Sequence, residues 1–132
     1  MTARNMKHHA WQKGMTLIEL MVALAIVALL LSIVVPRYFG SITRAEESVL
    51  KENLHTLRDA LDKHFADTGR YPDTLEQLVV KRYIRMVPDD PITKSSTTWT
   101  VIAPADAKLG AVYDIKSSAK GVGRNGKPYE EW

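Results

Sequence analysis

The chain has 132 residues, no cysteine and a formal net charge of +3. This length allows one small domain, and the lack of cysteine excludes disulfides, thiolate metal sites and cysteine nucleophiles. Arg4, Lys7 and Lys13 account for the whole positive excess, so the rest of the chain is formally neutral and has no basic run that could follow a phosphate backbone. We therefore expect no nucleic-acid binding.

A short basic segment ends at Gly14, and an almost unbroken apolar run, Met15–Val35, follows with one carboxylate, Glu19, near its start. An ordinary secretory signal is cleaved after its apolar region, which is then lost. The plausible cleavage position here, after Lys13-Gly14, precedes the apolar run. We therefore predict a leader over residues 1–14 and a mature protein that begins with its hydrophobic helix.

As a helix with a rise of about 1.5 Å per residue, residues 15–35 would span about 30 Å, the thickness of a bilayer core. This predicts a single-pass anchor, and the basic leader favours a cytoplasmic N-terminus. An ionisable side chain inside such a helix is costly to insert, so Glu19 is predicted to have a function. The alternative is a carboxylate that reaches the lipid headgroups. Pro36 and Gly40 predict a kinked or loosened stretch where the helix leaves the membrane.

Residues 36–67 form an amphipathic pattern that predicts a second, periplasmic half of the same helix. The charged positions include two favourable i,i+4 pairs, Glu47–Lys51 and Asp59–Lys63, and indicate a solvated face or contacts between subunits. His55 and His64 lie among polar residues and are interpreted as surface side chains. The apolar stripe is expected to pack on the C-terminal domain, with a coiled coil as the alternative; it consists of Ile42, Val49, Leu50, Leu54, Leu57, Leu61 and Phe65.

The C-terminal region, residues 68–132, is predicted to hold a short helix, a β-hairpin and a glycine-rich loop. Gly69 is placed as the C-cap of the long helix, and Asp73 or Thr74 caps the short one, with Glu76 or Gln77 closing a capping box. Thr97–Ala103 and Ala111–Lys116 are rich in β-branched and aromatic residues and predict two antiparallel strands. Four aromatic residues are expected to fill or cover the core: Trp99, Tyr113, Tyr129 and Trp132.

The N-terminal pattern of Gly14, Thr-Leu-Ile-Glu and a proline at the end of the apolar run resembles the class III signal of type IV pilins and type II secretion pseudopilins. Most members of those families have phenylalanine where this chain has Met15. The resemblance implies an α+β, type IV pilin-like fold, with the long N-terminal helix packed on a small antiparallel sheet. It also implies cleavage between Gly14 and Met15 by a prepilin peptidase, N-methylation of Met15, and assembly roles for Pro36 and Glu19. Glu19 would pair with the free α-amine of a neighbouring subunit.

A second block, made of Gly69-Arg70-Tyr71-Pro72, the short leucine helix and Pro88-Asp89-Asp90-Pro91, resembles the major pseudopilins of type II secretion systems. The resemblance implies a non-enzymatic subunit in the bacterial inner membrane, with its C-terminal domain in the periplasm. Such subunits form a homo-oligomeric helical filament with an inner-membrane assembly platform and minor pseudopilins, leaving membrane lipid as they assemble. The alternatives are a type IV pilin or minor pilin in adhesion, motility or DNA uptake, and a membrane-anchored enzyme or solute-binding domain, for which no motif speaks.

Major pseudopilins bind calcium near their C-terminal loop, and the resemblance places that region at Ser117–Tyr129. Ser117 matches the family pattern, but Lys120-Gly121 stands where the family has an acid, and Arg124 and Lys127 add positive charge. Calcium prefers several oxygen ligands, usually including carboxylates. The candidate ligands for a possible Ca²⁺ are therefore weak: Asp106, Asp114 and Ser117, with Glu130 and Glu131 further along.

Overall fold

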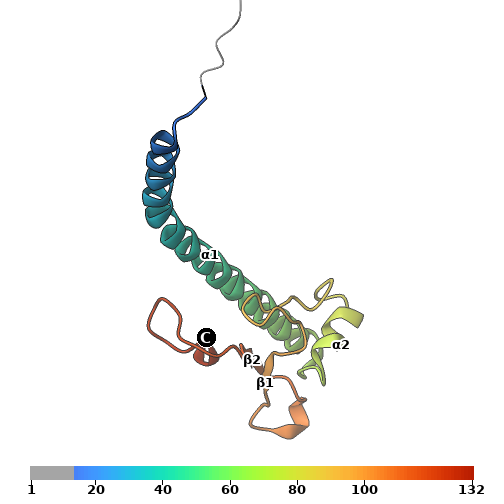
Figure 1. Cartoon of the computed structure of the whole chain (residues 1–132). Helices are drawn as coiled ribbons and strands as arrows, with labels where there is room; N and C mark the ends of the chain where they lie inside the picture. Colours follow the sequence, from blue (N-terminus) through green and yellow to red (C-terminus); the bar gives the residue numbers. More distant parts are fainter. Residues whose placement is uncertain (1–13) are drawn as a thin grey trace, which may run out of the picture. The chain divides into compact units, whose positions relative to one another are not determined.

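The computed structural model describes residues 14–132, so the predicted leader lies outside the described residues except for Gly14. Along the chain the elements are α1 (Leu17–Thr68), α2 (Leu75–Val80), β1 (Thr100–Ile102), the 3-10 turn η1 (Ala107–Leu109), β2 (Asp114–Lys116) and the 3-10 turn η2 (Tyr129–Glu131) (Figure 1). A long N-terminal helix and a small antiparallel sheet confirm the expected α+β fold. The chain divides into two compact units, Met1–Phe39 and Gly40–Trp132.

The described part of the first unit consists of the apolar start of α1 and the three residues before it. The helix continues through Pro36 and Gly40 instead of ending there, and the boundary between the two units falls at Gly40. Proline at position 36 removes the donor that would bind the carbonyl group of Ser32. The hydroxyl group of Ser32 donates to the carbonyl oxygen of Leu29 at 2.6 Å. The predicted kink or loosening at Pro36 stays a prediction.

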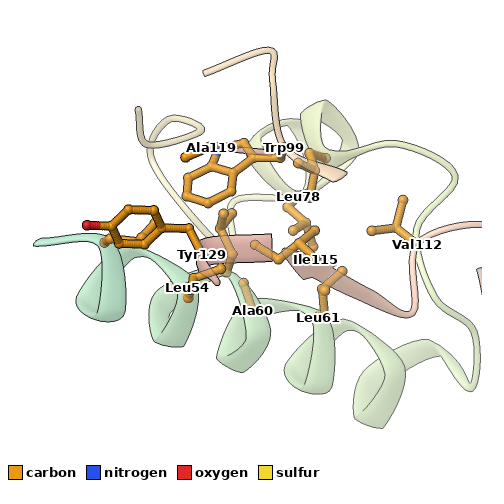
Figure 2. Close-up of a cluster of buried hydrophobic side chains, with 12 residues drawn as sticks. Leu54, Ala60, Leu61, Leu78, Trp99, Val112, Ile115, Ala119 and Tyr129 are labelled. Carbon is orange, nitrogen blue, oxygen red and sulfur yellow. The ribbon is translucent and has the colours of Figure 1, made fainter. Parts of the chain in front are cut away.

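The second unit contains the hydrophobic core, and α1 supplies the largest share of it (Figure 2). Leu50 and Leu57 on α1, Leu78 on α2 and Ile115 on β2 are completely buried. The apolar stripe of the helix therefore packs within its own chain, as predicted, and not as a coiled coil. The remaining members of the core are Leu54, Ala60, Leu61, Leu75, Trp99, Val112, Ala119 and Tyr129.

Three members of the predicted stripe differ from the expectation. Ile42 and Val49 are 37% and 48% exposed, because the C-terminal region does not cover the start of this helical half or the face that carries Val49. Phe65 is half-buried and stacks on Tyr71, with their ring centroids 4.5 Å apart. The helix therefore keeps an exposed apolar edge at Ile42 and Val49 after the domain has folded.

The end of α1 is fixed by Gly69, as predicted. Its φ angle is +72°, and its N–H donates to the carbonyl oxygen of Phe65 at 2.8 Å. His64 is buried, so its interpretation as a surface side chain is wrong. The turn after the helix folds back over it, and His64 Nδ1 lies 2.7 Å from the carbonyl oxygen of Arg70. Because a carbonyl group only accepts, Nδ1 carries the hydrogen in this contact.

The short helix α2 is capped by Thr74, whose hydroxyl oxygen accepts from the N–H of Gln77 at 3.3 Å. The side chain of Gln77 reaches back and accepts from the N–H of Asp73 at 2.8 Å. These contacts satisfy donors that the first turn of a helix leaves unpaired. Of the four residues considered for this cap, Thr74 is therefore the N-cap, and Gln77, not Glu76, closes it.

β1 and β2 pair antiparallel, as predicted, but each strand is shorter than expected. In the pairing, Val101 lies opposite Ile115. The N–H groups of Ala111 and Val112 donate to the carbonyl oxygen of Pro72 and not to β1, which ends the ladder early. Trp99 is buried beside the sheet, and its indole N–H donates to the carbonyl oxygen of Pro88 at 2.9 Å. Tyr113, by contrast, is half exposed and does not fill the core.

Candidate functional site

The start of α1 is a capping box built from Thr16 and Glu19. The hydroxyl oxygen of Thr16 accepts from the N–H of Glu19 at 3.2 Å, and Glu19 Oε2 accepts from the N–H of Thr16 at 2.8 Å. This exchange satisfies two donors that the first helical turn would otherwise leave open, and it fixes the helix start at Leu17. Thr-x-x-Glu before an apolar run is the sequence signature of this cap, so the hydrogen-bonding role of Thr16 could have been predicted from the sequence.

Glu19 keeps part of its binding capacity after it has formed this cap. A carboxylate has two oxygens, and only Oε2 is used by Thr16. Within residues 14–132, Oε1 has no hydrogen-bond partner. The negative side chain also lies at the positive end of the helix dipole, where a carboxylate is stabilised. The arrangement leaves an oriented, exposed acceptor at the very start of the apolar helix.

The predicted cleavage bond lies immediately outside the helix. Gly14 and Met15 are exposed and have no regular secondary structure, and no other group lies within 4 Å of the position that a Cβ on Gly14 would occupy. A peptide bond in such a segment can enter a protease cleft in extended form, whereas a bond inside a helix cannot do so without unfolding. The geometry is therefore compatible with hydrolysis between Gly14 and Met15.

The first half of α1 exposes its apolar side chains on every face. Leu17 and Ile18 are 74% and 73% exposed, and Leu24 and Leu29 remain at 60% and 66%. The helix is long and apolar enough to cross a membrane. Leaving this surface in water would cost about 25 cal/mol for each Å² of apolar area. Lipid, or other helices of the same kind, must therefore cover it.

The structure does not bring the three calcium candidates together. Asp106 accepts from the N–H of Lys108 as the cap of η1, and Asp114 binds Nε of Arg58 at 2.9 Å. Ser117 is buried and donates to Oδ2 of the fully buried Asp90 at 2.5 Å. Among residues 14–132, no three acidic or histidine side chains are gathered in a way that could hold a metal ion.

Sequence reasoning missed the contacts by which α1 holds the end of the chain. Glu47 is only 7% exposed, and its Oε1 accepts from the N–H of Arg124 at 2.9 Å and from the hydroxyl group of Tyr129 at 3.0 Å. The predicted Glu47–Lys51 pair is therefore wrong, because the loop supplies better donors, and Lys51 lies instead 4.9 Å from the ring centroid of Trp132. The other predicted pair is confirmed, with Asp59 and Lys63 2.8 Å apart.

Arg58 makes the third of these contacts. Its Nε binds Asp114, and its Nη2 donates to the carbonyl oxygens of Ile115 at 3.0 Å and Trp132 at 2.9 Å. We call Glu47, Lys51 and Arg58, together with the segment Lys120–Trp132 that they hold, the C-terminal clasp. The spacing of its helical residues, i, i+4 and i+11, places them along one face and was a signal that could have been found in the sequence.

The clasp raises the pKa of Tyr129 above its ordinary value of 10.0. Burial is the larger cause, since it disfavours the charged phenolate, and the hydrogen bond to Glu47 adds to it. An ion pair on the surface closes the same segment, because Nζ of Lys120 lies 2.6 Å from Oε1 of Glu130. That contact raises the pKa of Lys120.

Comparison with known proteins gives a consistent result for both halves of the chain. The sequence model of the prokaryotic N-terminal methylation motif matches residues 12–35. The type II secretion system core protein G of Klebsiella michiganensis is 34% identical over 61% of this chain and 68% of that protein. The protein of the same name from Vibrio cholerae is 35% identical over 65% of this chain and 69% of that protein.

A more distant similarity covers less of the sequence. The type IV major pilin protein PilA of Myxococcus xanthus is 35% identical, but the match covers 50% of this chain and 30% of that protein. No solved structure matches the chain.

Proposed function

Because the chain belongs to the family of the type II secretion system core protein G, we propose that it is a pseudopilin that a prepilin peptidase cleaves after Gly14 and that polymerises into a periplasmic filament driving protein export. The observation that carries the proposal is the start of α1. This segment contains, in order, an exposed cleavage bond, the carboxylate of Glu19 that caps the helix, and a helix whose apolar side chains are exposed on every face. The protein acts as a peptidase substrate and as a structural subunit, and catalyses nothing itself.

The processing step supplies the partner that Glu19 lacks. Hydrolysis between Gly14 and Met15 releases the leader and creates a charged α-amine on Met15, which N-methylation leaves cationic. In the filament, the amine of one subunit binds the carboxylate of Glu19 in the next. Oε1 is the oxygen open to it, since Oε2 serves the cap.

Burial of apolar surface supports polymerisation. Before assembly, lipid covers the first half of α1, which anchors the subunit in the inner membrane with its leader in the cytoplasm and its second unit in the periplasm. In the filament, equivalent helices replace the lipid. Ile42 and Val49, left exposed by the fold of their own chain, extend this helix-to-helix contact beyond the membrane. The remaining partners are the inner-membrane assembly platform and the minor pseudopilins.

A type IV pilin is the second candidate function. The Myxococcus pilin favours it, but that match covers half of the chain, whereas the secretion proteins match 61% to 65% of it. The Gly69–Pro91 block also resembles the secretion proteins and not pilins in general.

Deletion of the gene distinguishes the two functions. The secreted proteins in the culture medium and the pili seen by electron microscopy are compared between the deletion strain and the parent. Loss of specific secreted proteins with intact pili is the expected result. Loss of pili with intact secretion would assign the chain to the pilins instead. Complementation with a Gly14→Ala variant should not restore secretion, because the precursor should stay uncleaved, which an immunoblot would show.

A further inference from the structure

The glycine-rich loop of this chain has the wrong charge for a calcium site. Residues 117–129 contain no aspartate or glutamate, whereas Lys120, Arg124 and Lys127 place three cations there. Calcium takes six to eight oxygen ligands and usually several carboxylates. A divalent cation at this loop would meet positive side chains on the loop itself, so any carboxylates would have to come from elsewhere in the fold.

Three carboxylates near the loop already accept hydrogen bonds from protein donors, and the side chain of Glu131 beside them is exposed. Glu130 binds Lys120, and Glu47 binds Arg124 and Tyr129. Asp90 Oδ1 accepts from the N–H groups of Ile92 and Thr93, and its Oδ2 accepts from Ser117. Within residues 14–132, no buried side-chain nitrogen or oxygen atom lacks a hydrogen-bond partner. The residues present therefore do not fit the calcium ion that the family resemblance implies.

The loop is shaped by its own backbone. Gly123 N–H donates to the carbonyl oxygen of Lys127 at 2.9 Å, and Gly126 N–H donates to that of Gly123 at 3.0 Å. Val122 and Pro128 form an antiparallel bridge. These bonds close a small hairpin but do not attach it to the rest of the domain. Attachment to the helix comes from the clasp.

The clasp holds the loop through a carboxylate on the helix. Glu47 brings one negative charge from α1 under the loop and accepts two hydrogen bonds from it, one from the backbone of Arg124 and one from Tyr129. A hydrogen bond to an ionised acceptor is roughly twice as strong as a neutral one. In a calcium site, carboxylates on the loop surround a cation. Here the charges are reversed, because the loop supplies the donors and the helix supplies the carboxylate.

We propose that the C-terminal clasp replaces a metal ion in this chain: Glu47 anchors residues 120–132 on α1, and the domain folds and keeps its C-terminal loop ordered without any divalent cation. Arg58 completes the attachment by binding the last residue and β2 at once. The proposal concerns the folding of the isolated subunit, so its outcome is independent of whether the filament serves secretion or pili.

The first test measures thermal unfolding of the full chain in detergent micelles by near-UV circular dichroism, with excess EDTA and with calcium chloride. The expected midpoints are equal. At about 10 mM calcium, ten times the Kd of weak extracellular calcium sites, a genuine site would raise the midpoint by about 6 °C or more. Such a rise would overturn the proposal.

The second test follows amide hydrogen exchange of residues 120–132 in EDTA. Glu47→Ala should speed exchange in this segment at least about tenfold and lower the midpoint by about 4 °C or more, because it leaves the buried hydroxyl group of Tyr129 and the partly buried N–H of Arg124 without their acceptor. The matched control is Glu52→Ala, which removes an exposed carboxylate from the same helix and should leave exchange in the segment unchanged. Unchanged exchange in Glu47→Ala would show that the loop does not depend on Glu47.

Discussion

Glu47 accepts a hydrogen bond from the hydroxyl group of Tyr129 at 3.0 Å, across a separation of 82 residues in sequence. The contact joins the middle of the long helix to the last turn of the chain, and both side chains are buried. Next to it, the rings of Tyr129 and Trp132 make an edge-to-face contact, with their centroids 5.2 Å apart. A substitution at either residue should therefore loosen the C-terminal segment more than the leucine core.

Alkaline pH should weaken the clasp through Tyr129. Because its folded pKa is raised above the ordinary 10.0, the stability that it contributes is fully present below pH 10 and is lost as the pH rises through the folded pKa. Tyr129→Phe should lower the free energy of unfolding by about 1–2 kcal/mol at pH 8. Urea titrations from pH 8 upwards should show this difference shrinking above pH 10. A difference that stays constant until both proteins unfold would contradict the assignment.

The buried carboxylate of Asp90 should be among the most sensitive positions in the second unit. It satisfies two backbone donors and the hydroxyl group of Ser117, so Asp90→Ala should cost about 3 kcal/mol of unfolding free energy. Ser117→Ala removes one of these bonds and should cost about 1 kcal/mol. In a double-mutant cycle measured by urea unfolding, the double variant should lose less unfolding free energy than the sum of the losses of the two single variants. Strict additivity would mean that the Asp90–Ser117 bond contributes nothing.

A side chain at Gly123 should dislodge Trp132. A Cβ at this position would lie 2.3 Å from Cζ2 of Trp132, so the indole ring must move and lose its contacts with Lys51 and Tyr129. Gly123→Ala should destabilise the domain by about 1–3 kcal/mol, as overpacking does elsewhere. Gly40→Ala is the control, because that helical position is open and alanine favours the helix. Equal thermal midpoints for the two variants would contradict the packing described here.

Replacement of Glu19 should separate membrane insertion from assembly. Glu19→Ala removes a charge from an apolar helix and should insert in the membrane as well as the parent chain does. It also removes the acceptor for the neighbouring α-amine, so the yield of filaments sheared from cells should fall severalfold. Thr16→Ala, which weakens the cap but keeps the carboxylate, should fall less. A normal filament yield from Glu19→Ala would show that the carboxylate has no part in assembly.

Local patterns predicted the backbone of this protein better than its buried polar contacts. The spacing of Leu50, Leu54, Leu57 and Leu61 follows the period of the helix, so the stripe could be read directly from the sequence. Gly69 and Thr74 were predictable for the same reason, since a cap depends on neighbours within a few residues. The antiparallel pairing of the hairpin also followed from composition. The strands are shorter than predicted because the N–H groups of Ala111 and Val112 donate to the carbonyl oxygen of Pro72.

Glu47, His64 and Asp90 could not be placed in this way. Each is a polar residue in a context that is ordinarily solvated, and each is buried because a distant or returning segment supplies a matching group. For Glu47 that segment is the C-terminal loop, for His64 the turn at Arg70, and for Asp90 the end of the sheet at Ser117. Glu47 lies three residues before Leu50, in register with the buried stripe, but its carboxylate was interpreted as solvated because the helical pattern does not show the donors that a distant loop supplies.

The cap at Thr16 and Glu19 has a consequence for the product of cleavage. Both residues lie after the proposed cleavage bond, and both hydrogen bonds use atoms that its hydrolysis would leave unchanged. If cleavage follows Gly14 as proposed, the hydrogen bonds of the first helical turn would be available to the new N-terminus without rearrangement. The proposed cleavage would thus change the chemistry of a single nitrogen atom, from an uncharged amide to an ammonium group, and would leave the shape of the capped turn the same.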